Sequence, residues 1–266
     1  MIKIGFYQFN PKFKKINENC NKIIKKLNGI KADVIVLPEL AFIGYNFHDR
    51  KELESVAENP TDSNIVKKVT NLCFRNDFYI ITGFAEKFGQ SIFNSALLIG
   101  PEGIVDVYRK IHLFNREKLY FNPGDRPLTI NTVKGTKIGI MICFDWIFPE
   151  VARSLAILGA EVICQPANLV LSYCQNVMLA RSLENRVFSV TANRIGKEIF
   201  KHGSLEFTGQ SQVVAPNGDL LYRANSKKEL IYIHDIETKE ASNKNITKFN
   251  NIFDDRRPNF YKTLCM

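Results

Sequence analysis

Short apolar segments of strand length alternate with longer amphipathic segments through most of this chain, and this alternation limits the folds open to it. The expected strands are residues 2–9, 33–37, 78–85, 137–142, 161–165 and 187–193. The expected helices are residues 16–27, 149–158, 174–183 and a segment that places Ile65, Val69 and Leu72 on one face. A repeated switch between strand and helix periodicity is typical of α/β proteins, so we predict that class.

Two hairpins are expected in addition, over residues 96–105 and 212–221, because each has a Pro-x-Gly turn between arms rich in strand-forming residues. No linker, low-complexity tract or composition change divides residues 1–237, which we predict to be one domain. Residues 238–266 are polar and rich in Asn, apart from Ile252, Phe253, Phe260 and Tyr261. We expect this segment to be a C-terminal tail that packs on a second subunit, in a homodimer or a higher homo-oligomer.

The net charge of +9, from 36 Lys and Arg against 27 Asp and Glu in 266 residues, raises the question of an anionic partner. Seven of the lysines, however, fall between Lys12 and Lys31, around the apolar face of the helix expected over residues 16–27. They are explained as the solvated face of that helix, and no interleaved aromatic residues support base stacking. We therefore predict no binding to nucleic acid or to membranes.

The cysteines and the apolar runs favour a cytoplasmic protein without a metal or cofactor. No apolar run approaches the roughly 18 residues needed to cross a bilayer, and the first residues form no signal sequence. The six cysteines form no Cys-x-x-Cys pair and have no His at ligand spacing. Reduced thiols are the simplest interpretation of most of them, and Cys73 and Cys164, like Met141, are expected in the core.

Cys143 differs from the other cysteines in its position, because it closes an apolar strand pattern and precedes Pro149, which can begin a helix. A thiol at such a junction lies near free backbone N–H groups, which favour the thiolate and can stabilise an oxyanion. The alternative is a small buried side chain, which is the commoner fate of a single cysteine. Position alone makes Cys143 only a candidate nucleophile.

Two other expected strands also end at charged residues, Glu39 and Lys110. Ligands collect at the carboxyl ends of parallel strands, so both are candidate site residues, although a solvated charge at the start of a loop is the plainer explanation. Together with Cys143 they form a complete chemical set. The carboxylate can move a proton, the ammonium can stabilise negative charge and the thiolate can attack an electrophilic carbon.

Three motifs place the chain in a known family. Leu37-Pro38-Glu39-Leu40, Tyr108-Arg109-Lys110-Ile111-His112 and Ile142-Cys143-Phe144-Asp145-Trp146 resemble, in order and spacing, the Glu, Lys and Cys motifs of the nitrilase superfamily of carbon–nitrogen hydrolases. The resemblance covers nearly the whole chain and is greatest to small nitrilase-like and amidase members from thermophiles. It implies a four-layer αββα sandwich, often dimerised, and favours Cys143 as nucleophile over Cys143 as core residue.

The resemblance also implies roles for individual residues. Glu39 would be the general base and acid, Lys110 the oxyanion stabiliser, and Glu117, which matches a further Glu of many amidases, would position the substrate or Lys110. An exposed glutamate at a helix start is the alternative for Glu117. The residues expected to bind substrate lie in or beside the motifs and are Tyr45, Tyr120, Phe144, Trp146 and Asn168. A supporting buried polar network is expected from Arg181, Glu184 and Asn185.

Departures from the family pattern bear on the substrate. True nitrilases tend to have Cys-Trp-Glu where this chain has Cys143-Phe144-Asp145, which favours a small linear amide or N-carbamoyl substrate. Some thermophile members accept small aliphatic nitriles, so a nitrilase activity stays open. Many relatives have His in place of Gln165, so a hydrogen bond there is expected to differ.

Three other functions are compatible with parts of the pattern. A non-catalytic scaffold on the same fold would be indicated by loss of Glu39, Lys110 or Cys143, and all are present. An acyltransferase would use the same set with an amine in place of water. A papain-like enzyme using His112 is less favoured, because His112 is expected on an alternating strand and lacks an Asn to orient it.

Overall fold

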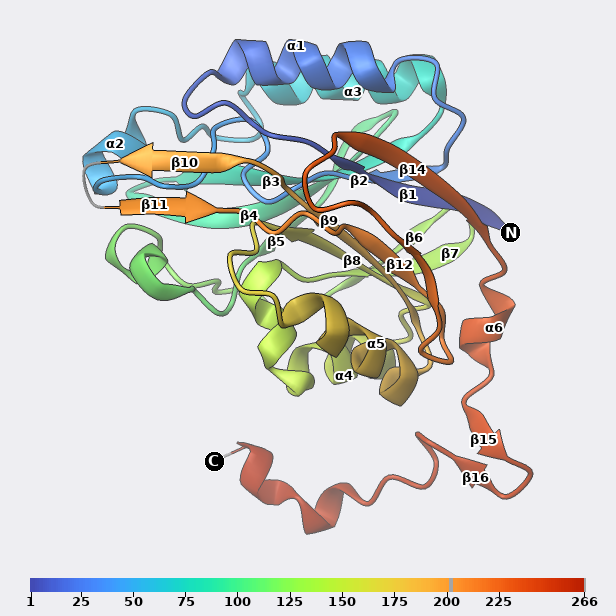
Figure 1. Ribbon diagram of the computed structural model, residues 1–266. Helices are drawn as coiled ribbons and strands as arrows, with labels where there is room; N and C mark the ends of the chain where they lie inside the picture. The colour runs from blue at the N-terminus through green and yellow to red at the C-terminus, as the bar shows by residue number, and fades with distance from the viewer. Residues whose placement is uncertain (201–202, 266) are drawn as a thin grey trace.

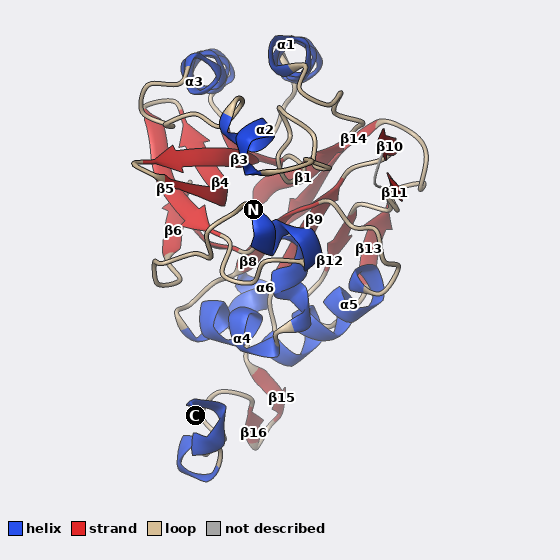
Figure 2. Cartoon of the chain, turned by 90° about the vertical axis from the view of Figure 1, so that its left-hand side faces the viewer, coloured by secondary structure: helices blue, strands red, loops and turns tan. Residues whose placement is uncertain are grey.

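The computed structural model describes residues 1–200 and 203–265 and has two sheets that lie face to face between two layers of helices (Figure 1). The first sheet has the order β14-β1-β2-β3-β4-β5. Its strands are β1 (Ile2–Gln8), β2 (Val34–Val36), β3 (Tyr79–Phe88), β4 (Ser91–Gly100), β5 (Gly103–Arg109) and β14 (Leu230–Ile236). Helices α1 (Ile16–Leu27) and α3 (Asn64–Asn76) cover its outer face (Figure 2).

The second sheet has the order β13-β12-β9-β8-β7-β6 and is covered by α4 (Pro149–Ile157) and α5 (Cys174–Asn185). Its strands are β6 (Ile130–Val133), β7 (Thr136–Ile140), β8 (Val162–Ala167), β9 (Phe188–Asn193), β12 (Gln212–Val214) and β13 (Leu220–Arg223). The central strands of both sheets, β1-β2-β3 and β7-β8-β9, are parallel. The protein is thus a four-layer αββα sandwich, as the resemblance implied.

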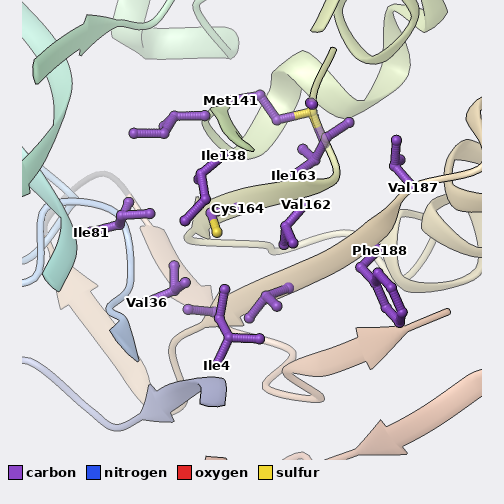
Figure 3. Close-up of a cluster of buried hydrophobic side chains, with 14 of the residues drawn as sticks. Ile4, Val36, Ile81, Ile138, Met141, Val162, Ile163, Cys164, Val187 and Phe188 are labelled. Atoms are coloured by element: carbon purple, nitrogen blue, oxygen red, sulfur yellow. The ribbon is translucent and has the colours of Figure 1, made fainter. Parts of the chain in front are cut away.

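Strand periodicity explains how one sheet serves two cores. In β2, Val34 and Val36 face the second sheet, while Ile35 packs against the helices, because successive side chains of a strand point to opposite faces. Figure 3 shows the core between the sheets, where Ile4 and Val36 lie with side chains of the second sheet such as Cys164. The predictions of core positions for Cys73, Cys164 and Met141 are confirmed, since all three are fully buried.

Helix α1 has the two faces that its sequence predicts. Cys20, Ile23 and Leu27 are fully buried in the core beneath the helix, while Lys25 and Lys26 are exposed. The hairpins β4–β5 and β12–β13 are also found as expected. Over residues 1–200 and 203–265, every helix is too short or too polar to span a bilayer.

Several short elements carry no strong periodic pattern and were not expected. They are α2 (Arg50–Glu54), the 3₁₀ turns η1 (Asn115–Leu119) and η2 (Cys143–Ile147), and the hairpin of β10 (Lys197–Phe200) and β11 (Gly203–Glu206). The strand before Cys143 also ends earlier than expected, at Ile140. As shown below, η1, η2 and the β10–β11 hairpin border the candidate site, so function concentrates where periodicity is weakest.

The C-terminal segment leaves the body below the α4–α5 layer (Figures 1 and 2). It contains α6 (Lys239–Ser242), the small hairpin of β15 (Asn245–Thr247) and β16 (Asn250–Asn251), and the 3₁₀ turns η3 (Pro258–Phe260) and η4 (Lys262–Cys265). One tie to the body is Lys244, whose Nζ donates to the carbonyl oxygens of Asn185 and Arg186 at 3.1 and 2.8 Å. The exposed Phe249 and Phe260 lie farther along the segment.

Candidate functional site

Glu39 lies just beyond β2, at the carboxyl end of the parallel strands of the first sheet, and is fully buried. The chain on either side of it is tied to β3, since the Leu37 N–H donates to Ile81 O at 2.8 Å and the Gly83 N–H to Pro38 O at 3.1 Å. A β-carbon on Gly83 would lie 2.4 Å from Glu39 Cα, so only glycine lets β3 pass this close. The sheet therefore fixes the backbone of Glu39.

Lys110 follows β5 and is held in the same way. Its N–H donates to Asn94 O on β4 at 2.8 Å, and its own carbonyl accepts from the Gly124 N–H at 2.8 Å. A β-carbon on Gly124 would lie 2.2 Å from Arg109 O, so glycine is required here too. These ties aim the Lys110 side chain at the end of β2, where Glu39 lies.

The Lys110 ammonium lies between two buried carboxylates. Its Nζ is 2.7 Å from Glu39 Oε1 and 2.8 Å from both oxygens of Glu117, which is fully buried in η1. Asn94 Nδ2 donates to Glu39 Oε1 at 2.7 Å, and Tyr45 Oη donates to Glu117 Oε1 at 2.5 Å. The interpretation of Glu117 as an exposed helix-start residue is therefore wrong: its carboxylate and that of Glu39 share one cation.

Burial and neighbouring charges together shift the pKa values at this site. Burial raises the pKa of the Glu39 carboxyl above its ordinary 4.5, and the charge of Glu117 adds to this while Lys110 opposes it. Burial by itself lowers the pKa of Lys110, but Glu117 and Glu39 outweigh it and the net shift is upward. Burial also raises the pKa of the Cys143 thiol well above 9.0, and Glu39 adds to that shift. At neutral pH the site therefore holds an ammonium and a protonated thiol.

Cys143 opens η2, beyond the end of β7, and its backbone is held in an unusual conformation. Its φ of +41° lies in the left-handed region, which residues with a β-carbon rarely adopt unless their surroundings impose it. The fully buried Asp145 side chain ties this turn down, because it accepts from the Ile142 N–H at 2.9 Å, the Tyr108 hydroxyl at 2.6 Å and the His112 N–H at 3.2 Å. The thiol is thus placed by a buried network across the two sheets.

Two amide side chains of the second sheet connect Cys143 to Glu39. Gln165 Nε2 donates to the Cys143 carbonyl at 2.9 Å, while its Oε1 accepts from the Thr191 hydroxyl at 2.8 Å. Asn168, which follows β8, donates through Nδ2 to the Glu39 carbonyl at 2.8 Å. Gln165, where the sequence comparison expected a different hydrogen bond from that of a His, therefore donates to the loop that carries Cys143.

A narrow cleft opens over Cys143. Its volume of about 20 Å³ is roughly the room that one water molecule needs. Three of the five residues expected to bind substrate, Phe144, Trp146 and Asn168, line it together with Cys143. The other two, Tyr45 and Tyr120, line a neighbouring hollow instead.

Three buried acceptors of the site, Glu39 Oε2, Asn94 Oδ1 and Asn168 Oδ1, have no hydrogen-bond donor among the described residues, and the first belongs to a titratable group. Among the described residues, nothing donates a hydrogen bond to the buried Glu39 Oε2, whereas Glu39 Oε1 accepts from both Asn94 and Lys110. A buried carboxylate oxygen without a donor favours uptake of a proton at that atom. Glu39 is therefore suited to accept a proton from a neighbouring group.

Two expectations need correction. Arg181 does support the site, because its Nε donates to the Trp146 carbonyl at 3.2 Å, but its ion-pair partner Glu184 has a side chain 38% exposed and lies outside any buried network. His112 lies beyond the end of β5, not on an alternating strand, and it does have an orienting acid. Its Nδ1 lies 2.9 Å from Asp145 Oδ1 and its ring stacks on Phe148.

Sequence reasoning missed a buried ion pair that braces the Tyr45 loop. Arg194 pairs with Glu198, and the Glu198 carboxylate accepts from the backbone N–H groups of Tyr45 and Asn46, the latter at 2.8 Å. Both members of the pair are almost wholly buried. An arginine and a glutamate four residues apart, at the end of a strand, are the only sequence signal, and such a pair is usually a surface one.

No metal site is evident in the part of the chain that the structure describes. Residues 1–200 and 203–265 contain no group of three or more His, Cys, Asp or Glu side chains that could ligate an ion. Glu39 and Glu117 are paired with Lys110. The chemistry that this arrangement can perform is proton transfer and nucleophilic attack with electrostatic support.

Comparisons with known proteins agree with this geometry. A family model described as carbon-nitrogen hydrolase matches residues 3–243. A nitrilase of Pyrococcus abyssi is 40% identical over 264 residues, which are 98% of this chain and 99% of the relative. An N-carbamoylputrescine amidase of Solanum tuberosum is 31% identical over 266 residues, 92% of this chain and 88% of the relative. The crystal structure of a carbon-nitrogen hydrolase from Helicobacter pylori superposes with a TM-score of 0.82 at 24% identity, covering 100% of this chain and 98% of that one.

Proposed function

Since this chain belongs to the carbon–nitrogen hydrolase family, we propose that it cleaves a non-peptide C–N bond of a small linear amide or N-carbamoyl compound through a thioester on Cys143. The observation that carries this proposal is the Lys110 ammonium held between the buried carboxylates of Glu39 and Glu117, beside a buried thiol. That arrangement supplies a base, a fixed cation and a nucleophile. The products are an acid and ammonia or an amine.

The first half of the reaction forms the thioester. Glu39 takes the Cys143 proton on its free Oε2, and the sulfur adds to the carbonyl carbon of the substrate. Once Glu39 is neutral it holds Lys110 less tightly, so an ammonium N–H can turn to the developing oxyanion together with the backbone N–H of Phe144. The C–N bond then breaks, and Glu39 returns the proton to the leaving nitrogen.

The second half releases the acid. Water loses a proton to Glu39 and adds to the thioester carbon, and the same donors stabilise the second oxyanion. The C–S bond breaks and the proton returns to Cys143. Atoms balance over the cycle, since one water is consumed and one C–N bond is replaced by a C–O bond.

The narrow cleft supports a small, flat acyl group. Its walls are mostly apolar, including Phe144, Trp146 and Leu169, and its free volume is small. The acyl carbon must therefore approach Cys143 without a bulky substituent.

The five described cysteines Cys20, Cys73, Cys143, Cys164 and Cys174 are all unpaired, which suits a reducing compartment such as the cytoplasm, and we propose that location.

A nitrile substrate is the second candidate, supported by the nitrilase relative at 40% identity. Addition of the thiolate to a nitrile carbon gives a thioimidate, which water converts to the same thioester and ammonia. The same residues serve both substrates. The ratio of turnover on matched amides and nitriles distinguishes them.

The test is a panel of small amides, N-carbamoyl compounds and aliphatic nitriles, with ammonia release and intact-protein mass as readouts. We expect ammonia release by the wild-type protein and an acyl adduct confined to Cys143. Cys143→Ala removes the nucleophile and is expected to lower the rate at least 1,000-fold, roughly the loss seen when a nucleophile of this kind is deleted. Cys73→Ala, a change to a buried thiol outside the site, is the matched control.

Three results would contradict the proposal in different ways. Wild-type ammonia release by Cys143→Ala would exclude the thioester. An adduct that transfers only to added amines would identify an acyltransferase. No adduct on any compound, with Cys143 reduced, would favour a non-catalytic scaffold.

A further inference from the structure

A second hollow adjoins the Cys143 cleft. It has a volume of about 190 Å³, and Phe114 and Val170 line both it and the cleft. Its other walls come from the Tyr45–Asn46 loop, the η1 turn and the start of β11. A substrate bound at Cys143 therefore has an adjacent space, several times larger than the cleft, into which its distal end can extend.

Hydrogen bonds to buried carboxylates hold the walls of this hollow in place. Tyr45 is fixed at both ends, because its hydroxyl donates to Glu117 and its N–H donates to the buried Glu198. Asn46 is held by the same Glu198 carboxylate at 2.8 Å. The hollow is thus a preformed feature that shares the walls of Phe114 and Val170 with the Cys143 cleft, and ligand-binding pockets are usually preformed.

One charged side chain, Arg116, lines the hollow among the described residues, and no carboxylate does. The Arg116 guanidinium donates through Nη2 to the His48 carbonyl at 3.0 Å. Within residues 1–200 and 203–265 it forms no ion pair with an acidic side chain. A guanidinium anchored on a neutral carbonyl keeps other N–H groups available for an anion.

The charges of the site orient an anionic substrate. Glu39, Glu117 and Lys110 sum to −1 when both carboxylates are ionised, so a substrate carboxylate is repelled from the Cys143 end. Arg116 attracts it to the other hollow. The amide end, which is neutral, is then left to face Cys143.

We propose that the hollow beside Arg116 is a subsite for a carboxylate, and that the preferred substrates are short linear amides with a carboxylate at the opposite end. The neutral polar side chains of Asn46, Asn115 and Ser204 line the same space and can complete the hydrogen bonding of the anion. This inference rests on the proposed function and names the substrate class for it.

The experiment compares carboxylate-ended amides with neutral amides of equal length, succinamate against butyramide and glutaramate against valeramide. We expect higher kcat/KM for the carboxylate-ended member of each pair, and a preference that weakens as salt is raised. Arg116→Gln is expected to lower kcat/KM for succinamate about 10- to 100-fold, the range of a lost charged hydrogen bond. The loss is expected mainly in KM, because the contact is remote from the reacting atoms.

Lys118→Gln is the matched control, since it removes the same charge two positions away, from a residue that lines a different hollow. Lys118→Gln is expected to leave kcat/KM for both succinamate and butyramide unchanged. Arg116→Gln is expected to leave kcat/KM for butyramide unchanged. Equal kcat/KM for both members of each pair, or an unchanged kcat/KM of Arg116→Gln for succinamate, would overturn the proposed subsite. Either result would leave the proposed hydrolase function standing.

Failure of the proposed function gives a different pattern. If the wild-type protein hydrolyses none of the four amides, calorimetric titration with succinamate tests the subsite alone. The subsite would be supported if succinamate binds the wild-type protein and Lys118→Gln but does not bind Arg116→Gln. Absence of binding would overturn it.

Discussion

At the scale of single residues, the central fact is that one ammonium serves two carboxylates. Lys110 contacts both Glu39 and Glu117, and the nearby charge of Glu117 makes Glu39 harder to ionise. Glu39 has a free oxygen and a raised pKa, whereas Glu117 is saturated by Lys110, Tyr45 and the Phe114 N–H. The same residue type is therefore held in two environments at one site, and we propose proton transfer for Glu39 and support of Lys110 for Glu117.

The dependence of activity on pH follows from these shifts. Glu39 must be ionised to act as base, and its pKa is raised, so kcat/KM is expected to fall on acidification at a pH above the ordinary 4.5 of a glutamate. On the alkaline side the raised pKa of Lys110 keeps the ammonium charged. Glu117→Gln removes a charge that raises the pKa of Glu39, so the acid limb is expected to move to lower pH.

The pH profile of kcat/KM from pH 4 to 10 checks this prediction. Glu117→Gln is also expected to lower the plateau about 10- to 100-fold, because Lys110 loses one of its two anchors. Glu150→Gln, which changes an exposed carboxylate, is the control. An acid limb that stays in place or moves to higher pH in Glu117→Gln would rule out the assigned coupling.

At the scale of elements, short irregular segments hold the reacting groups while the sheets hold the segments. The η2 turn holds Cys143 at a positive φ, and Asp145 braces this turn by accepting from the N–H groups of Ile142, just before η2, and of His112, after β5. The Tyr45 loop is braced similarly by Arg194, which donates to Asn10 Oδ1 at 2.7 Å and pairs with Glu198. Strain near the nucleophile is thus balanced by buried polar contacts from other elements.

Asp145→Asn tests the brace of η2. The change keeps the shape but turns one acceptor into a donor that faces other donors, and an unsatisfied buried group costs about 1–3 kcal/mol. We expect Tm to fall by roughly 3–10 °C, and kcat/KM by about tenfold or more, because a nucleophile displaced by less than 1 Å reacts more slowly. Thermal denaturation and the alkylation rate of Cys143 are the measurements.

Tyr108→Phe provides the comparison, because it removes one donor and leaves Asp145 its backbone partners. Its loss in the free energy of unfolding is expected to be smaller, about 1 kcal/mol. Asp145→Asn with the wild-type Tm and rate would show that the turn is held by other means.

At the scale of the whole molecule, the body and the C-terminal segment differ in how their apolar side chains are used. The body has two cores, one between the sheets and one beneath α1 and α3. Beyond α6, whose Ala241 is buried in the first core, Phe249, Phe260 and Leu264 are at least 64% exposed. Exposed apolar side chains clustered on a projecting segment are typical of a protein–protein contact.

We propose that residues 238–266 are a tail that packs on a second copy of the chain and makes the protein a homodimer. A chain that ends at Asn243 keeps α6 and both sheets, so it is expected to fold and to run as a monomer. Phe249→Ser combined with Phe260→Ser in the full chain is expected to weaken dimerisation without removing the tail. Analytical ultracentrifugation of the three proteins checks this, with Phe88→Ser, a change to an exposed aromatic of the body, as control.

A full-length monomer, or a dimer that survives removal of residues 244–266, would contradict this role of the tail.

Periodicity in the amino-acid sequence predicts the α/β class, and the resemblance of its motifs to a known family predicts the αββα sandwich and the candidate site residues. Period-two and period-3.6 patterns placed most strands and the four long helices, because which face is buried is a local property of each segment. Their positions at the ends of predicted strands made Glu39, Lys110 and Cys143 candidate site residues, because ligands collect at the carboxyl ends of parallel strands. The resemblance to the nitrilase superfamily implied their roles and added Glu117, which follows no strand pattern.

The tertiary fold sets which of these groups contact one another. These contacts join residues far apart in sequence: Glu39 with Asn94 across 55 positions, Tyr108 with Asp145 across 37, and Asn10 with Arg194 across 184. A polar residue carries no periodic signal that names its partner, and its pKa depends on burial and on every nearby charge. For that reason the sequence predicted a glutamate, a lysine and a cysteine, while the directions in which their pKa values shift and the hollow beside Arg116 came from the fold.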